Sequence, residues 1–159
     1  KTPNSNDIEK ATKRIRRLDN SVSGEDPKKK KKKLQDIMQL YFGVFREGNS
    51  MHTGLEKLED LKEQIEHMHL RDKSRIFNTS RIEALELSNL FAVAQATAIT
   101  AEHRKESRGA HARSDFEKRD DENWMKHSLF FEKDKRVTYR AVNFSPESMD
   151  PFPPTARTY

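Results

Sequence analysis

The chain has 159 residues, of which 36% are charged and 33% hydrophobic, so it is long enough for one compact domain with a modest core. Its five glycines form no Gly-x-Gly pair and it contains no cysteine, which excludes a glycine-rich dinucleotide loop, disulfides, thiolate metal sites and a cysteine nucleophile. The net charge of +5 is local, because residues 1–33 carry 12 Lys or Arg against 5 Asp or Glu and leave −2 for the remainder.

Two helices are predicted in the first 48 residues. The first runs from about Asp7 to Asn20 after a cap at Ser5 or Asn6. Its apolar face would hold Ile8, Ala11, Ile15 and Leu18. Asp26-Pro27 predicts the start of the second, because aspartate caps free amides and proline needs no donor at the first helical position. Its apolar stripe comprises Leu34, Ile37, Met38, Tyr41, Phe42 and Phe45, and Gly48 is the expected stop.

Two further helices follow. Apolar residues spaced three and four apart predict a helix from about Ser50 to His69, and a segment without proline or glycine predicts another from Ser80 to Ser107. The latter should be the most buried, with Gly109 at the position just after its end. Because the connections are short, we expect a mainly α fold with an antiparallel three- to four-helix bundle over residues 1–109.

Residues 110–159 are expected to form an extended tail with a small β-hairpin. Ser128 to Phe131 and Val137 to Phe144 are rich in β-branched and aromatic residues, and a polar turn separates them. Prolines then keep the C-terminal end extended, at positions 146, 151, 153 and 154. The aromatic side chains of the tail exceed what it can bury by itself, so it should lie along another surface. No membrane span or secretory signal is expected, and the lack of cysteine fits a reducing cytoplasm.

The run Lys28 to Lys33 raises the hypothesis of a basic helical protein that binds nucleic acid or an anionic membrane. Six consecutive residues surround a helix instead of forming a stripe, and no aromatic residue is interleaved to stack on bases. We therefore interpret the run as a solvated helix start.

Two other groups could suggest metal binding. His67 and His69 lie on opposite sides of the predicted helix, whereas helical metal sites use residues four apart. The consecutive carboxylates of residues 120–122 lack the alternating spacing of a calcium loop. We expect surface positions for the histidines and a turn or helix cap for the carboxylates, and no metal site.

The densest group of acid, base and anion-binding side chains follows the last predicted helix. It comprises Glu102, His103, Glu106, Arg108, His111, Arg113 and Asp115. An enzyme centred on Glu106, Arg108 and His111 is one interpretation, because arginine binds carboxylates and histidine titrates near neutral pH. The other, which we favour, is that these groups satisfy backbone and partner groups where the helix ends.

Several stretches resemble the C-terminal region of the succinate dehydrogenase and fumarate reductase flavoproteins. They are RKESRGAHAR at 104–113, DF at 115–116 and RDDENWMKHSL at 119–129. GEDP at 24–27, FREG at 45–48, FNTSRIEALELSNL at 77–90 and the closing PPTARTY at 153–159 are similar in order and spacing. Trp124 and the final Tyr159 favour succinate dehydrogenase over quinol-fumarate reductase, and the short path from Arg113 to Trp124 resembles bacterial forms. Glu117 departs from the family, which usually has proline there.

The resemblance implies a full-length subunit that carries FAD covalently and oxidises succinate to fumarate. It implies electron transfer to an iron–sulfur subunit, held by membrane anchor subunits on the cytoplasmic side of the bacterial inner membrane. The family's catalytic and FAD-binding residues match no position in this chain, so we expect this part to be inactive alone and to hold neither flavin nor metal. Its expected partners are the flavin-binding domain and the iron–sulfur subunit, with no nucleic acid. The expected contacts to the missing domains are Arg108, Gly109, His111, Arg113 and Trp124.

Overall fold

The structure is a computed structural model that describes residues 2–153 and 155. The helices are α1 (Ser5–Asp19), α2 (Pro27–Phe42), α3 (Gly48–Glu66), α4 (Thr79–His103) and the short α5 (Asp121–Trp124). The strands are β1 (Phe45–Arg46), β2 (Ala112–Arg113), β3 (Lys126–Phe131) and β4 (Arg136–Ala141), with a 3-10 turn, η1, at Glu132–Asp134. The predicted mainly α fold with a small hairpin is confirmed, while Pro154 and Tyr159, named above, lie outside the described residues.

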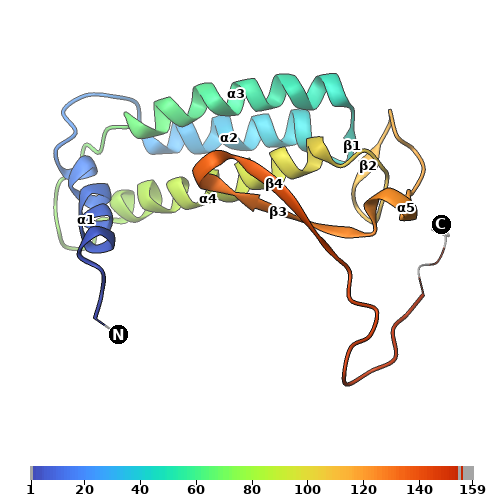
Figure 1. Ribbon diagram of the computed structural model, residues 1–159. Coiled ribbons are helices and arrows are strands. Elements are labelled where there is room, and N and C mark those ends of the chain that lie inside the picture. Colours follow the sequence, from blue (N-terminus) through green and yellow to red (C-terminus); the bar gives the residue numbers. More distant parts are fainter. Residues whose placement is uncertain (1, 154, 156–159) are drawn as a thin grey trace.

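The core lies between α2, α3 and α4, which pack against one another with α3 antiparallel to the other two (Figure 1). Leucines from all three helices are at most 1% exposed, namely Leu34, Leu58, Leu61 and Leu87. The helices α2 and α3 approach closely at Gly54, where an added Cβ would lie 2.5 Å from Cβ of Tyr41. Glycine is therefore required at position 54, because any side chain there would clash with α2.

Helix α1 lies at the end of the bundle where α4 begins (Figure 1). Its Leu18 is buried, and Arg14 donates hydrogen bonds to the carbonyl of Leu85 at 2.6 Å and to Asn89 at 2.7 Å. The apolar face predicted for this helix is only partly buried, because Ile8 and Ile15 are 54% and 44% exposed. Only the C-terminal part of α1 contacts the bundle core.

The turn between α2 and α3 begins earlier than predicted. Helix α2 ends at Phe42 with Gly43 as its cap, and Gly48 is the first residue of α3, so the prediction of Gly48 as the stop was wrong. The reason is local: the Glu47 carboxylate accepts hydrogen bonds from the first amides of α3 and starts that helix. Phe45, predicted on the apolar stripe, lies in β1 and is 84% exposed.

Helix α4 ends at His103, so the predicted end at Ser107 and the assignment of Gly109 to the residue after the helix were both wrong. Gly109 instead begins a tight two-residue turn closed by hydrogen bonds of 2.9 Å between Arg108 and His111 in both directions. Its φ of +55° is a conformation that glycine adopts at little cost. The helix stops early because a buried arginine side chain binds its last carbonyls, as described below.

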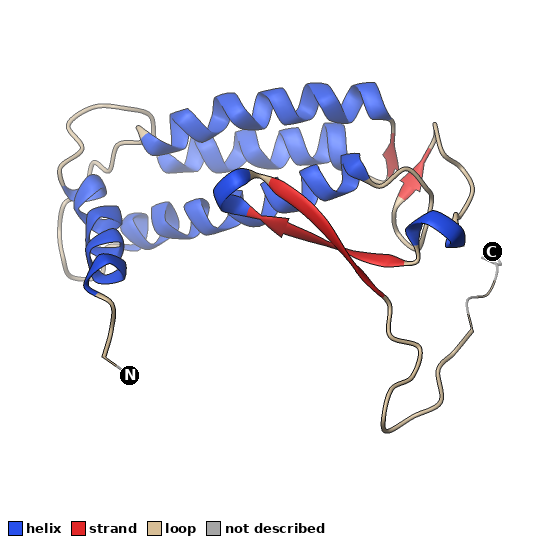
Figure 2. Ribbon diagram, in the orientation of Figure 1, coloured by secondary structure: helices blue, strands red, loops and turns tan. Residues whose placement is uncertain are grey.

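The predicted hairpin is confirmed as β3 and β4, which pair antiparallel from Lys126 opposite Ala141 to Phe131 opposite Arg136. It lies beside α4, and the chain after β4 leaves the bundle as an extended tail (Figure 2). The sequence did not predict the short parallel pair formed by β1 and β2, in which Arg46 lies opposite Arg113. This pair holds the segment after α4 against the turn between α2 and α3.

Candidate functional site

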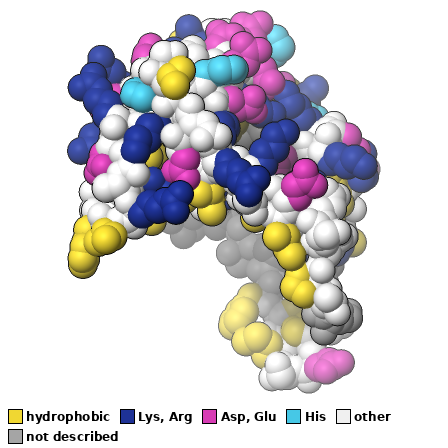
Figure 3. Space-filling model, turned by 90° about the vertical axis from the view of Figure 1, so that its left-hand side faces the viewer, with side chains coloured by type: hydrophobic (Ala, Val, Ile, Leu, Met, Phe, Trp, Pro, Cys, Tyr) yellow, Lys and Arg dark blue, Asp and Glu magenta, His cyan; other side chains and the backbone are white. Residues whose placement is uncertain are grey.

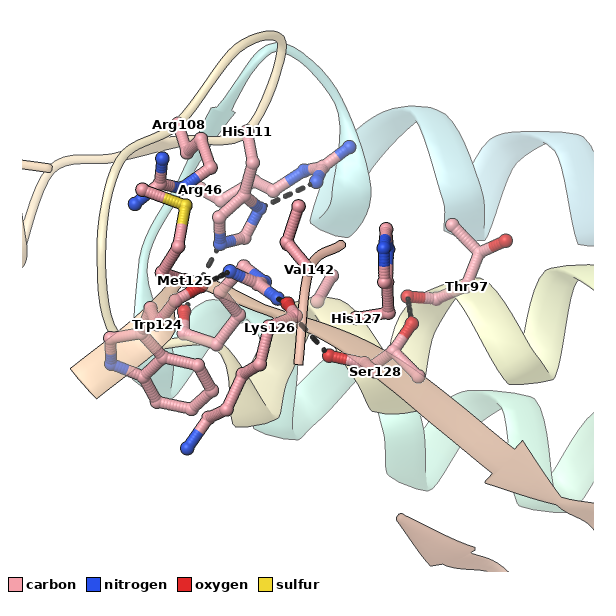
Figure 4. A pocket seen from close by; sticks show the side chains of 13 residues that line it. Arg46, Thr97, Arg108, His111, Trp124, Met125, Lys126, His127, Ser128 and Val142 are labelled. Carbon is pink, nitrogen blue, oxygen red and sulfur yellow. Dashed lines mark hydrogen bonds between the residues drawn. The ribbon is translucent and has the colours of Figure 1, made fainter. Parts of the chain in front are cut away.

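The charged side chains that the sequence singled out after the last predicted helix meet at the C-terminal end of α4. There residues 104–128 wrap around the helix end, and β1 supplies Arg46, whose side chain lies next to His111 (Figure 4). Three arrangements make up this site: a buried carboxylate, a helix cap made by an arginine, and a neutral histidine between two arginines.

Glu106 is the buried carboxylate, with 0% exposure. Its oxygens accept hydrogen bonds from Arg104 at 2.5 Å, from Nε and Nη2 of Arg108 at 2.8 and 3.1 Å, and from the backbone amide of Asp120 at 2.9 Å. Burial alone would raise the pKa of Glu106, but these hydrogen bonds outweigh it and the pKa is lowered. The side chain is therefore a charged structural centre that joins the end of α4 to the start of α5.

Arg113 caps α4. Its Nη1 donates to the carbonyls of Ala101, Glu102 and Arg104 at 3.4, 3.1 and 3.2 Å, so it satisfies acceptors that lack partners at a helix end. Its other two nitrogens bind the carboxylate of Asp115. The side chain is 2% exposed, which makes it part of the interior and not of a contact surface.

His111 lies between two arginines. Its Nδ1 is 2.8 Å from Nη1 of Arg46, and its Nε2 is 3.1 Å from the carbonyl oxygen of Arg104. A guanidinium can only donate, so Nδ1 accepts and the proton of the neutral ring is on Nε2. Burial lowers the pKa of His111, and the positive charges of Arg46, Arg113 and Arg104 lower it further. The ring is therefore held neutral in one tautomer.

Trp124 ends α5 beneath a group of cations. The Arg104 guanidinium lies 5.2 Å from the centre of its ring, and the Lys126 ammonium lies 4.9 Å from it and 4.2 Å from the ring of Tyr139. The two rings contact edge to face with centroids 5.7 Å apart. Such cation–π contacts contribute roughly 0.5–1 kcal/mol each at exposed sites. They attach the hairpin to the end of α4.

An open cleft of about 450 Å³ lies between the end of α4, the 108–111 turn and β3 (Figure 4). Its ionisable lining residues among those the structure describes are Arg46, Arg104, Arg108, His111, Lys126 and His127, and its lining includes no Asp or Glu. Thr97, Thr100, Ala101, Trp124, Met125, Ser128 and Val142 complete it. The cleft is thus positively charged, with Glu106 buried behind it.

The structure brings most of the predicted contact residues to this one end of the molecule. Arg108, His111 and Trp124 line the cleft, Arg113 is buried beneath it, and Gly109 lies in the turn at its edge. The sequence interpretation did not select Arg46 or Arg104 individually, although FREG and RKESRGAHAR contain them. No spacing rule relates Arg46 to a site 65 residues later.

The acidic run and the two histidines that were considered as metal ligands make hydrogen bonds within the fold instead. Asp120 caps α5 through the amide of Asn123, which confirms the helix-cap interpretation of this acidic run. His67 and His69 bond to different backbone carbonyls, those of Glu63 and Ser21. Among the described residues, no three His, Asp or Glu side chains are placed to hold a metal ion. Within the same part of the chain, every helix is too short or too polar to cross a membrane.

The lysine run is not uniformly solvated. Lys30 is 3% exposed, and its ammonium lies 2.7 Å from Glu25 and 2.8 Å from the side-chain oxygen of Gln64 in α3. Lys33 bonds to the same oxygen at 3.1 Å, and Lys32 pairs with Asp36 at 2.5 Å. Seen from the α1 end, basic and acidic side chains are interspersed on the surface (Figure 3). The interpretation of the run as a wholly solvated helix start was wrong at Lys30.

Comparison with known proteins identifies relatives over nearly the whole chain. A family model described as fumarate reductase flavoprotein C-term matches residues 31–159. The succinate dehydrogenase flavoprotein subunit of Coxiella burnetii is 46% identical over 99% of the chain, and the fumarate reductase flavoprotein subunit of Haemophilus influenzae is 36% identical over 77%. The chain spans only 27% and 20% of the length of these two curated relatives.

A solved structure supports the same relationship in three dimensions. The E. coli quinol fumarate reductase matches 96% of this chain with a TM-score of 0.81 and 31% sequence identity. This chain covers 27% of that protein's chain. Both the sequence and the fold therefore match one part of a longer polypeptide.

Proposed function

Because the chain belongs to the succinate dehydrogenase and fumarate reductase flavoprotein family, whose C-terminal domain it forms, we propose that it is a structural and docking module of a longer flavoprotein subunit. We propose that it has no activity alone and that its cleft-side surface packs against the flavin-binding domain of the same subunit. Arg108, Gly109, His111 and Trp124 would form these contacts directly, and Arg113 would hold them in place from beneath. The helical domain at 1–109 and the tail at 110–159 would both take part.

The longer subunit, in this proposal, carries covalent FAD, oxidises succinate to fumarate and passes electrons to an iron–sulfur subunit. Membrane anchor subunits would then hold the complex on the cytoplasmic side of the bacterial inner membrane. The higher identity to a succinate dehydrogenase subunit than to a fumarate reductase subunit favours succinate oxidation as the physiological direction. Quinol-fumarate reductase is the alternative for the same fold.

The saturation of the polar groups at the end of α4 supports a structural role. A general base needs a lone pair that can reach a substrate, yet the carboxylate of Glu106 is fully buried and accepts four hydrogen bonds. Arg113 is likewise engaged with one carboxylate and three carbonyls. Only Arg108 and His111 of the three residues in the enzyme hypothesis line the cleft.

The residues of this chain do not fit an FAD site. Proteins commonly bind the FAD pyrophosphate at a glycine-rich turn leading into a helix N-terminus. Side-chain acceptors already cap the N-termini here: Asp26 on α2, Glu47 on α3 and Asn78 on α4. Two of these are carboxylates and would repel a phosphate. We therefore assign the flavin and its redox chemistry to the missing part of the subunit.

Nucleic acid is not a partner in this proposal. A phosphate-binding face needs several cations on one side, but Lys30 is directed into the bundle and the other lysines surround the helix. A salt titration tests this point. Affinity for duplex or single strands that falls steeply with salt would restore the nucleic-acid hypothesis.

Reconstitution tests the module function. The chain and the remainder of its subunit are purified separately and together, and each sample is assayed for bound FAD and for succinate-dependent reduction of an artificial electron acceptor. We expect the chain alone to bind no flavin and show no turnover, and the combined polypeptides to recover both. Flavin binding or turnover by the isolated chain would contradict the proposal.

A further inference from the structure

The cleft at the end of α4 has more positive charge than its own neighbours neutralise. Four of its lining side chains are Arg or Lys, and among the described residues none of its lining is acidic. Two carboxylates bind its cations: Glu106 is shared by Arg104 and Arg108, and Asp121 pairs with Arg108 at 2.5 Å. Arg46 and Lys126 have no acidic partner among the described residues. Cations gathered in a partly enclosed cleft concentrate their field and attract anions.

Three of these cations keep donors that a ligand could use. Nη2 of Arg46, Nη1 of Arg108 and the ammonium of Lys126 have no hydrogen-bond partner among the described residues. Arg104 differs, because both of its terminal nitrogens are occupied by Glu106 and by carbonyls of the 124–126 segment. The volume of about 450 Å³ is sufficient for a small ligand.

We propose that this cleft binds a small oxyanion of the sulfate, phosphate or carboxylate class between Arg46, Arg108 and Lys126, and that binding is coupled to protonation of His111. Arginine pairs with planar or tetrahedral oxyanions through two parallel hydrogen bonds, while lysine adds a point charge. The inference deepens the proposed function, because Arg108 and His111 belong to the same cleft-side surface that is proposed to pack against the flavin-binding domain.

The coupling to His111 follows from its two hydrogen bonds. Nδ1 cannot carry a proton while it accepts from Arg46, and burial together with nearby cations lowers the pKa of His111. An anion that takes both terminal nitrogens of Arg46 draws Nη1 away from Nδ1 and cancels part of the positive field. Nδ1 is then free to take a proton, so binding raises the pKa of His111.

The charged groups around His111 do not reverse the direction of this pKa change. Arg46, Arg104 and Arg113 lower its pKa, and Arg108 and Lys126 add positive charge across the cleft. The acidic groups near these elements, Glu106, Asp115 and Asp121, are already paired with arginines. By linkage, the anion must bind more tightly as the pH falls through the pKa of His111.

An NMR titration of the His111 ring tests the proposal, with sulfate as the probe because it remains a dianion over the range in which histidine titrates. The pKa of His111 is measured in sodium sulfate and in sodium chloride of equal ionic strength. We expect a higher pKa in sulfate and a sulfate affinity that increases at acid pH. An equal pKa in both salts would overturn the proposal.

Matched lysine variants separate the cleft from general charge attraction. Lys126→Gln removes a cation from the cleft, whereas Lys133→Gln removes one from the turn of the same hairpin. Lys126→Gln should weaken sulfate binding about two- to fivefold, the effect of one exposed ion pair, while Lys133→Gln leaves it unchanged. Equal weakening in both variants would show an adventitious ion only and overturn the site.

The oxyanion could come from solution or from a carboxylate of the longer subunit, and the same titration in that subunit distinguishes these sources. A pKa of His111 that sulfate still raises supports a free anion. A pKa already raised without sulfate supports a carboxylate side chain of the same polypeptide. A low pKa that sulfate does not change would overturn the proposal for the full-length protein.

Discussion

Arg113 and Asp115 meet through two hydrogen bonds of 2.6 Å each, although they are only two residues apart in the chain. Asp115 also accepts the backbone amide of Gly48 at 3.0 Å, and Arg113 binds the last carbonyls of α4. One ion pair therefore connects the end of α4, the strand β2 and the start of α3. The geometry depends on the planar fork of arginine, which lysine cannot reproduce.

Arg113→Lys should keep the charge but lose the cap on α4. We expect a loss of about 1.5–3 kcal/mol in the free energy of unfolding, the range for hydrogen bonds that involve a charged group. Amide hydrogen exchange should show the largest increase over the last turn of α4. An equal increase in exchange rate across α2, α3 and α4 would indicate that loss of the α4 cap does not cause the destabilisation.

Acid should destabilise the fold through Asp115. Hydrogen bonds from Arg113 lower its pKa from 3.8 to about 2, so in this range the unfolded chain binds more protons than the folded chain. The stability that this carboxylate contributes is therefore present above about pH 4 and lost as the pH falls towards 2. Urea unfolding at several pH values measures the effect, and Asp115→Asn should flatten the curve in this interval.

His111 adds a second, milder dependence with the same sign. Its pKa in the folded chain lies below 6.5, so folding favours the neutral ring. Stability from this residue is complete above about pH 6.5 and declines below it. His111→Gln should remove that part of the pH dependence while Asp115 still titrates at lower pH.

Glu106→Gln tests the buried carboxylate with little change in shape. The amide would place an NH₂ group against Arg104 and Arg108, leave Arg104 without a carboxylate and leave Arg108 with Asp121 alone. We expect a loss of about 3–5 kcal/mol, the cost of removing one member of a buried ion pair. Glu102→Gln, four residues earlier at the end of α4, should change stability by less than about 0.5 kcal/mol. Similar values for the two variants would contradict a central role for Glu106.

Lys30→Ala and Lys32→Ala separate the buried lysine from an exposed one in the same run. The first should cost about 1.5–3 kcal/mol through the lost bond to Gln64 and a gap against α3. The second, whose side chain is 71% exposed, should change stability by less than about 0.5 kcal/mol. Thermal unfolding of both proteins gives the comparison.

The sequence predicted the elements of this fold better than their ends. Asp26-Pro27 starts α2 as expected, because capping is a local interaction that the residue types reveal. Gly48 was misassigned because the neighbouring Glu47 caps the start of α3 there. Gly109 was misassigned because the end of α4 depends on the distant guanidinium of Arg113. Contacts across the fold decide such boundaries, and single-sequence patterns do not contain them.

The same distinction applies to the candidate site. The group from Glu102 to Asp115 was visible as a dense run of charges, and its structural interpretation agrees with the saturated bonding of Glu106. Arg46 could not be found in this way, because it reaches His111 only through the parallel pairing of β1 with β2. The sequence also could not show which of six identical lysines is directed inward.

The burial of Lys30 gives the lysine run a function as a spacer. Pro27, Lys30, Leu34 and Ile37 are the inward positions of α2, separated by three, four and three residues. Deleting any one lysine would rotate the helix start by about 100° relative to the leucine that follows. The number of lysines thus fixes the rotation of the Asp26 cap about the helix axis relative to the core residues of α2. Inserting or deleting a lysine should therefore disturb the fold more than replacing one at an outward position.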